Sequence, residues 1–199
     1  MTGPTKIRTT GLLFAGGESK RMGKEKGLSP VGDYLLYQYP LRVLESLTQT
    51  ILISTCKAFD IKETHEQVCD EIAGIGPMGG LYTCLKYSKT DLNLILPYDL
   101  PLVHSDLFHF LMPYVQEYEV VVPAMESGKP EPLCGIYSKS VLPVIQEMIQ
   151  EENYTMHQLV NRVHSKIVLV DSSLSFFHER LFRNINTPTD LEDILPDKG

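Results

Sequence analysis

The chain has 199 residues, of which 43% are hydrophobic and 22% are charged, and its formal net charge is −7. This size and composition are typical of one globular domain, and we expect a single domain over residues 1–199 with its core at about residues 8–195. An acidic chain lacks the broad basic surface of nucleic-acid-binding proteins, so we expect no nucleic-acid partner. The sequence has no run of 18 apolar residues and no apolar stretch of signal-peptide length at its start, which favours a cytoplasmic protein without a membrane partner.

Short apolar runs bounded by polar or glycine residues predict five strands. They lie at Gly11–Phe14, Ile51–Ser54, Leu92–Leu96, Val120–Pro123 and Lys166–Val170. Runs of this kind are typical of strands that are covered on both faces. Because helical segments alternate with them, the order predicts an α/β fold with a Rossmann-like, doubly wound and mostly parallel sheet. Ligands of such sheets bind at the carboxyl ends of the strands.

Helices are predicted in the segments between the strands. The segment Tyr34–Leu47 is one, and Pro40 either kinks it or marks its true start. A second helix is expected to open after Gly79-Gly80. Apolar faces at helical spacing predict two more, over residues 141–149 and 156–163. A short helix near residues 190–193 ends the predicted fold.

The first predicted strand leads into a loop that is rich in glycine and in positive charge. Four cations fall within seven residues of this loop: Lys20, Arg21, Lys24 and Lys26. Glycines let the backbone approach a ligand and cations offset phosphate charge, so the loop favours a nucleoside triphosphate. It has neither the GxxxxGK[ST] nor the GxGxxG spacing, which indicates a different loop design. The alternative is an ordinary connection with exposed lysines.

A single carboxylate, Asp99, follows the third predicted strand and stands between Pro97 and Pro101. At the carboxyl end of a strand it would lie at the ligand edge of the sheet. A carboxylate beside phosphates is a natural Mg²⁺ ligand. The alternative is a turn aspartate that accepts hydrogen bonds from nearby amides.

Two further segments leave more than one interpretation open. The run Gly76-Pro77-Met78-Gly79-Gly80 either makes a tight structural turn or brings bare backbone and a helix N-terminus close to a base or ribose. Near the end of the chain, Asn184 and Asn186 precede the last predicted helix. Asn186 either helps to hold a metal ion or caps a turn.

The cysteines show no metal-binding or redox spacing. Cys56, Cys69, Cys84 and Cys134 are scattered, without a CxxC pair. Zinc ligands are spaced more closely, and cytosolic thiols are usually reduced. We therefore expect four reduced cysteines that act as small buried hydrophobic residues.

Taken in chain order, these segments resemble the molybdenum cofactor guanylyltransferases, the MobA family. The likeness extends from Leu12 to Leu191 and rests on Phe14-Ala15-Gly16-Gly17-x-Ser19-x-Arg21-Met22-Gly23, Lys26, Gly76-Pro77-x-Gly79-Gly80, Asp99-x-Pro101 and Asn184-x-Asn186-Thr187-Pro188. The resemblance implies the GT-A-like nucleotidyltransferase fold. It also implies transfer of GMP from GTP to the terminal phosphate of molybdopterin (Mo-molybdopterin) cofactor, with release of pyrophosphate and with Mg²⁺ as cofactor.

The resemblance further implies roles for single residues. The catalytic residues would be Lys26, Arg21 and Asp99, with Asp99 as the metal ligand. The residues that contact the nucleotide would be Phe14, Ala15, Gly16, Gly17, Lys26, Ser54, Asp70, Gly79 and Asp99. The residues that contact the acceptor would be Pro132, Leu133, Asn184 and Asn186. Ser54 stands where the family often has asparagine, which affects substrate choice more than reaction type.

The implied partners are GTP and molybdopterin cofactor, together with molybdoenzymes or cofactor-delivery proteins that would receive the product. Two alternatives stay open. One is a related nucleotidyltransferase with another nucleotide or acceptor, such as cytidylyl transfer to molybdopterin or nucleotidyl transfer to a sugar phosphate. The other is a non-catalytic nucleotide-binding adaptor.

Overall fold

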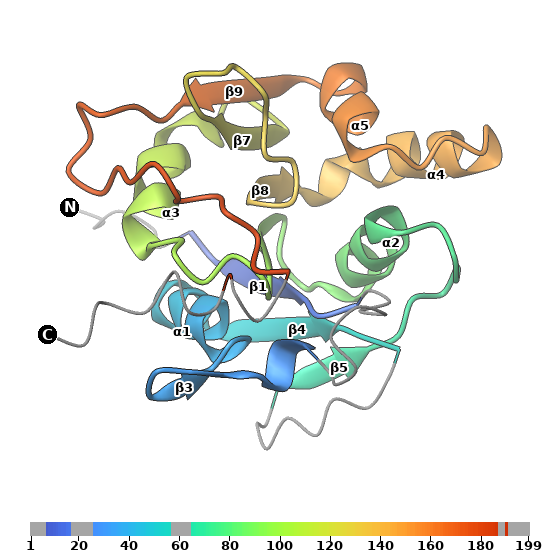
Figure 1. Ribbon diagram of the computed structural model, residues 1–199. Coiled ribbons are helices and arrows are strands. Elements are labelled where there is room, and N and C mark those ends of the chain that lie inside the picture. The colour runs from blue at the N-terminus through green and yellow to red at the C-terminus, as the bar shows by residue number, and fades with distance from the viewer. Residues whose placement is uncertain (1–6, 17–25, 57–64, 187–189, 191–199) are drawn as a thin grey trace, which may run out of the picture.

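The structure, a computed structural model, describes residues 7–16, 26–56, 65–186 and 190. Its centre is a sheet that contains β1 (Thr9–Phe14), β4 (Thr50–Ser54), β5 (Glu66–Val68), β6 (Leu92–Pro97), β7 (Val120–Ala124), β8 (Gly135–Ser138) and β9 (Ser165–Leu169). The strand order is β5-β4-β1-β6-β8-β7-β9 (Figure 1). A separate two-stranded hairpin consists of β2 (Pro30–Val31) and β3 (Tyr34–Leu35). The five predicted strands are confirmed, with ends that differ by at most two residues.

The sheet is parallel except at β8. β1 pairs in parallel with β4 and β6, β4 with β5, and β7 with β9, whereas β8 is antiparallel to both of its neighbours. The carboxyl ends of the parallel strands therefore lie at one edge, and β8 begins at that same edge. The predicted doubly wound, mostly parallel sheet is confirmed. β8 itself was not predicted, since its four residues include only two large apolar side chains, Ile136 and Tyr137, between a glycine and a serine.

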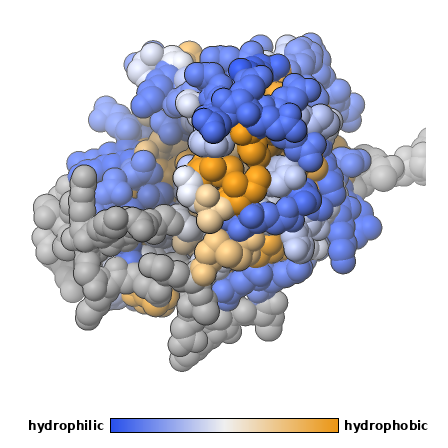
Figure 2. Space-filling view, turned by 90° about the vertical axis from the view of Figure 1, so that its right-hand side faces the viewer, coloured by the Kyte–Doolittle hydropathy of each residue, from blue (hydrophilic) through white to orange (hydrophobic). Residues whose placement is uncertain are grey.

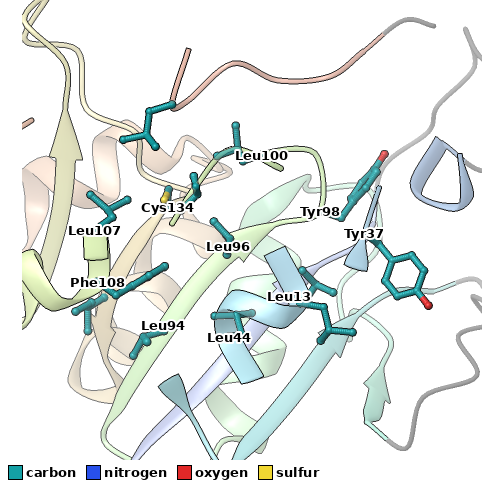
Figure 3. Packing of buried hydrophobic residues seen from close by; sticks show 14 of the residues in the cluster. Leu13, Tyr37, Leu44, Leu94, Leu96, Tyr98, Leu100, Leu107, Phe108 and Cys134 are labelled. Carbon is teal, nitrogen blue, oxygen red and sulfur yellow. The ribbon is translucent and has the colours of Figure 1, made fainter. Parts of the chain in front are cut away.

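Helices cover both faces of this sheet. They are α1 (Gln38–Leu47), α2 (Pro77–Tyr87), α3 (Ser105–Leu111), α4 (Leu142–Gln150) and α5 (Met156–Arg162), with 3₁₀ turns η1 (Lys26–Leu28), η2 (Met112–Tyr114) and η3 (Lys139–Val141). Successive strand residues point to opposite faces, so Leu13 packs in a cluster with α1 and α3, and Leu12 in a second cluster with α2, α4 and α5. Figure 3 shows Leu44 of α1 and Phe108 of α3 in the first cluster.

On the side of the molecule where α2 and α4 lie, hydrophilic residues surround a central apolar area (Figure 2). Half-buried apolar side chains that pack against the second cluster include Tyr82 of α2 and Val144 of α4. Within the described residues, none of the helices combines the length and the hydropathy that a membrane span requires.

The start of α2 differs from the sequence expectation. α2 begins at Pro77 and not after Gly79-Gly80, so both glycines lie in its first turn. Gly76 is the N-cap residue, with φ of 64°, a conformation that glycine adopts without strain. Proline suits the first helical position because its missing N–H would have no intrahelical partner there.

The start of α1 also differs. The segment predicted to be helical from Tyr34 begins with β3, and α1 starts only at Gln38. Pro40 lies in the first turn of α1, which agrees with the expectation that this proline marks the start of the helix and does not kink it. The helices predicted over residues 141–149 and 156–163 are confirmed as α4 and α5. The final predicted helix lies, apart from Asp190, outside the described residues.

Candidate active site

The carboxyl ends of β4, β1 and β6 lie side by side. Phe14, the last residue of β1, pairs in register with Ser54 of β4 and with the last residue of β6. Beyond the strands, the Ala15 amide donates to the Ser54 carbonyl at 2.9 Å, and the Tyr98 amide donates to the Phe14 carbonyl at 3.0 Å. Because strand pairing continues past the strand ends, the first loop and the turn after β6 start from a common rigid edge.

Three distant segments of the chain meet at the Lys26 ammonium. Its Nζ lies 2.9 Å from Asp99 Oδ2 and donates to Asn186 Oδ1 at 2.9 Å. It also lies 5.3 Å from the centre of the Tyr98 ring. The Lys26 side chain is only 5% exposed. A buried ammonium is stable only with such partners, and of the cationic loop the structure describes Lys26, which meets Asp99 as expected.

The two partners of the buried Lys26 ammonium reach the surface of the described structure. An ammonium has three N–H donors, and Asp99 and Asn186 take two of them. The Asp99 side chain is 21% exposed, and Asn186 is exposed. The contacts with described residues thus account for two of the three donors, and both partners are partly exposed.

A short segment after β9 returns to this edge and positions Asn186. The Ile185 amide donates to the Asp99 carbonyl at 3.0 Å, and the Ile185 side chain is fully buried. The Asn186 amide donates to Asp190 Oδ2 at 2.9 Å, and Arg183 pairs with Asp190 Oδ1 at 3.1 Å. Sequence reasoning missed Asp190. Its signal was an acidic residue at the start of a predicted helix, where carboxylates accept backbone N–H bonds.

Ser54, the last residue of β4, and Asp70, which follows β5, lie at the same edge of the sheet, across β1 from Asp99. Ser54 Oγ donates to Asp70 Oδ1 at 3.1 Å. The first turn of α2 packs so closely here that a Cβ on Gly80 would lie 2.5 Å from Ser54 Oγ. A Cβ on Gly79 would lie 2.7 Å from the Ile72 carbonyl oxygen. Gly79 faces a backbone oxygen that cannot rotate away and is thus required for helix packing, whereas Gly80 faces a side-chain hydroxyl; the contact of Gly79 favours the structural interpretation of their motif. Burial raises the pKa of Asp70, while the hydrogen bond from Ser54 acts to lower it.

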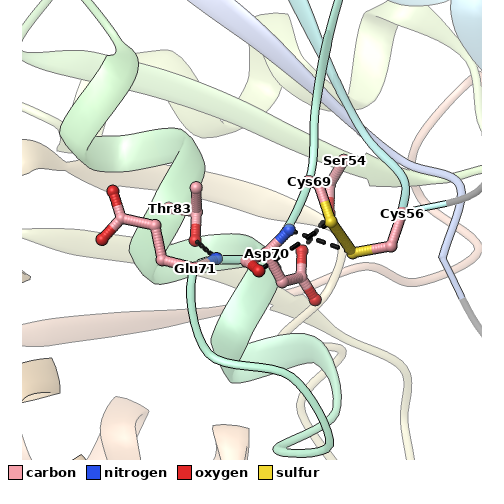
Figure 4. The surroundings of a disulfide bond; sticks show 6 residues. All are labelled: Ser54, Cys56, Cys69, Asp70, Glu71 and Thr83. Carbon is pink, nitrogen blue, oxygen red and sulfur yellow. Dashed lines mark hydrogen bonds between the residues drawn. A yellow bond between two sulfur atoms is a disulfide. The ribbon is translucent and has the colours of Figure 1, made fainter.

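The expectation of four reduced, buried cysteines is wrong for two of them. Cys56 and Cys69 are exposed and form a disulfide, with their Cα atoms 4.3 Å apart (Figure 4). Their separation of 13 positions is not a recognisable motif, and only the pairing of β4 with β5 makes them neighbours. Cys84 and Cys134 are free and buried, as expected.

The predicted acceptor residues come from two segments at the same edge of the sheet. Pro132 and Leu133 lie in the loop between β7 and β8. Pro132 is buried, and its carbonyl accepts the Tyr137 hydroxyl at 2.5 Å, whereas Leu133 is half-buried. Asn184 is exposed, and Asn186, which is also predicted to contact the acceptor, contacts Lys26. Two predicted site residues, Gly17 and Arg21, lie outside the described residues.

Comparison with known proteins identifies the family to which the chain is similar. The description "MobA-like NTP transferase domain" matches residues 11–167. The "Probable molybdenum cofactor guanylyltransferase" of Flavobacterium johnsoniae is 34% identical over 187 residues, which cover 93% of this chain and 95% of that protein. The protein of the same description from Carboxydothermus hydrogenoformans is 29% identical over 194 residues, which cover 94% of each chain.

Solved structures of nucleotidyltransferase-like proteins share the fold of this chain. "Molybdopterin-guanine dinucleotide biosynthesis protein A" from Archaeoglobus fulgidus superposes with a TM-score of 0.77 at 20% identity and covers 92% of this chain and 95% of that one. A putative protein from Aquifex aeolicus superposes with a TM-score of 0.72 at 25% identity over the same shares. The matched residues include Ser54 of β4 and the turns after β5 and β6 that carry Asp70 and Asp99. The chain therefore belongs to the MobA-like NTP transferase family of nucleotidyltransferases.

Proposed function

We propose that this chain transfers GMP from GTP to the terminal phosphate of molybdopterin cofactor, releases pyrophosphate and so forms the guanine dinucleotide cofactor. The convergence of Lys26, Asp99 and Asn186 at the carboxyl edge of the sheet carries the proposal. The relatives described as guanylyltransferases support this choice of reaction.

The reaction requires alignment and charge neutralisation more than proton transfer. The acceptor phosphate is already an anion near neutral pH, so the site needs no general base. It must instead bring two anionic groups together and stabilise the charge that develops during transfer. Lys26 would donate its third N–H to a phosphate oxygen of GTP, and Arg21 would add a second positive charge.

A divalent metal ion is common among nucleotidyltransferases of this family, and the residues here fit Mg²⁺. Carboxylate and amide oxygens are the ligands that Mg²⁺ prefers, and Asp99 and Asn186 already direct one oxygen each at a single cation, the Lys26 ammonium. No cluster of three or more acidic, histidine or cysteine side chains that could hold a metal occurs in the described part of the chain. One protein carboxylate together with substrate phosphates is a common Mg²⁺ site, and we assign Asp99 to it. Bound Mg²⁺ would neutralise the triphosphate and stabilise the departing pyrophosphate.

The nucleotide would lie along the ends of β1, β4 and β5. The backbone of Phe14, Ala15, Gly16 and Gly17 would border it, as would Ser54, Asp70 and Gly79. An ionised carboxylate only accepts hydrogen bonds, and the base-pairing edge of guanine presents two adjacent N–H donors. Asp70 suits that edge better than the edge of cytosine, which presents a single amino donor beside acceptors.

The acceptor would lie on the other side of Lys26. Asn186 and Asn184 would contact it from the segment after β9, and Pro132 and Leu133 from the loop between β7 and β8. Both segments begin at the edge of the sheet where Asp99 lies. Molybdoenzymes or cofactor-delivery proteins are proposed as further partners, which would receive the product.

The test is a screen of the four nucleoside triphosphates against molybdopterin cofactor and a panel of sugar phosphates, with Mg²⁺ and detection of pyrophosphate. We expect pyrophosphate release only with the combination of GTP and molybdopterin cofactor. Release with CTP in place of GTP, or with a sugar phosphate in place of the pterin, would replace the proposal by the related transferase activity. Tight GTP binding without pyrophosphate for every acceptor would establish the adaptor function instead.

A further inference from the structure

Strand pairing holds Cys56 and Cys69 together independently of the bond between their sulfur atoms. β4 and β5 run in parallel with Ser54 opposite Val68, and the Thr55 amide donates to the Val68 carbonyl at 3.0 Å. The cysteines that follow each strand are thereby adjacent and exposed. Two thiols held at this distance can form and break a disulfide without a rearrangement of the sheet, and small thiols can reach them.

The same sulfur pair is in direct contact with Asp70. The Asp70 amide donates to Cys56 Sγ at 3.1 Å, and Asp70 follows Cys69 in the chain. On its other side, the Glu71 amide donates to Thr83 Oγ1 of α2 at 2.9 Å. Figure 4 shows Asp70 between these two anchors. Among the described residues, the Cys56 sulfur thus holds the Asp70 amide, and the disulfide also links the preceding residue, Cys69, to the end of β4.

We propose that Cys56 and Cys69 are a thiol–disulfide site whose oxidation state sets the affinity of the chain for the guanine nucleotide, through the position of Asp70. The inference rests on the proposed function, in which Asp70 contacts the base. In the oxidised form, Asp70 is already held in place and loses less freedom when the nucleotide binds. In the reduced form, the Cys69–Asp70 backbone is attached to β4 by hydrogen bonds alone.

The oxidant is a low-molecular-weight disulfide of the glutathione class. One cysteine thiolate attacks it, forms a mixed disulfide and releases one small thiolate, and the second cysteine thiolate then displaces the other small thiolate. Two protein thiols and one small disulfide thus give one protein disulfide and two small thiols, with the two protons passing to the released thiolates. Excess small thiol drives the reverse reaction.

The expected effect is a five- to tenfold lower Kd for GTP with Mg²⁺ in the oxidised form, a typical size for coupling between two sites in one protein. Linkage requires that GTP shift the thiol–disulfide equilibrium toward the disulfide by the same factor, roughly five- to tenfold. The second measurement needs no catalysis and no pterin, so it is independent of the transfer reaction.

The experiment compares wild type with the double variant Cys56→Ser/Cys69→Ser after treatment with oxidised or reduced glutathione. Intact mass and thiol counts in denaturant report the disulfide, and calorimetry reports the Kd for GTP. We expect wild type to respond and the double variant not to respond. Cys134→Ala, which removes a buried free thiol far from this pair in the fold, is the matched control and should respond like wild type.

Two results would overturn the inference. One is a wild-type chain that keeps four thiols after oxidation, and the other is a formed disulfide with a change in Kd of less than about twofold. Either result leaves the proposed function intact as long as GTP binds. Failure of GTP to bind in both redox states would refute the proposed function and the inference together.

Discussion

Lys26 is the one charged residue with a buried side chain among the residues that the structure describes. An ammonium without partners in such a position would cost several kcal/mol, roughly the penalty for a single desolvated ion. Asp99 and Asn186 offset this penalty, yet both are themselves accessible. A buried cation whose partners reach the surface is well placed to neutralise a bound anion.

Substitution of Lys26 tests this directly. We expect Lys26→Ala to lower the rate of pyrophosphate release about a hundredfold or more, because one preorganised donor to a phosphate in the transition state is lost. Lys89→Ala, which removes an exposed lysine after α2, should leave the rate unchanged. A folded Lys26→Ala variant, as judged by circular dichroism, with nearly normal turnover would contradict the assignment.

Asp70 should give opposite effects on stability and on binding. Burial raises the pKa of its carboxyl above the ordinary value, so the folded chain holds this proton more tightly than the unfolded chain does. The free energy of unfolding therefore falls as pH rises through the interval between the ordinary pKa and the raised pKa. At neutral pH the ionised Asp70 is consequently destabilising.

We expect Asp70→Asn to raise the Tm at about pH 7 and to leave it nearly unchanged at a pH below the ordinary pKa of aspartate, about 3.9. The amide can still accept the hydrogen bond of Ser54. The Kd for GTP should rise about tenfold or more, since a charge-assisted hydrogen bond to the base is lost. Thermal melts across this pH range and GTP titration measure both effects. A lower Tm for the variant at neutral pH would show that the carboxylate stabilises the fold.

At the scale of elements, the segment after β9 completes the site that the strands begin. The hydrogen bond from the Ile185 amide to the Asp99 carbonyl fixes it to the turn after β6. Within the segment, Asp190 accepts the Asn186 amide and pairs with Arg183. A loop residue that holds a lysine with the proposed catalytic role needs such support, because small displacements of a positioning group reduce rates strongly.

Asp190→Ala tests the contribution of this support. We expect kcat to fall about tenfold, while KM for GTP changes little, because Asn186 no longer holds Lys26 in one position. Glu179→Ala removes an exposed carboxylate from the same segment and is the control. Asp190→Asn, which keeps an acceptor for the Asn186 amide, should recover part of the activity. An unchanged kcat for Asp190→Ala would mean that Lys26 and Ile185 alone suffice to place Asn186.

At the scale of the whole molecule, β8 joins the two halves of the sheet. It lies between β6 and β7 and runs against both, so the loop that leads into it opens beside Asp99 and not at the far edge. Gly135 is the first residue of this strand, and a Cβ there would lie 2.5 Å from the Val121 carbonyl oxygen and 2.9 Å from Val122 Cγ1. Backbone atoms of a central strand cannot move aside easily.

We expect Gly135→Ala to lower the free energy of unfolding by about 1–3 kcal/mol, the usual cost of an overpacked core. Urea denaturation measures this change. Gly16→Ala is the control for stability, since its Cβ would lie 3.8 Å from the Ser54 carbonyl oxygen, an ordinary contact. A Gly135→Ala chain as stable as wild type would show that β7 and β8 can separate without loss.

The sequence by itself determined the alternation of strands and helices and the two segments that carry Lys26 and Asp99. These features are local: an apolar run predicts a strand, and a parallel sheet brings strand ends to one edge whatever lies between them. The tertiary structure alone decided the Cys56–Cys69 pair, the support of Asn186 by Asp190 and the antiparallel insertion of β8. Each of these depends on strand register or on side-chain contact between segments, and neither leaves a pattern within a short stretch of sequence.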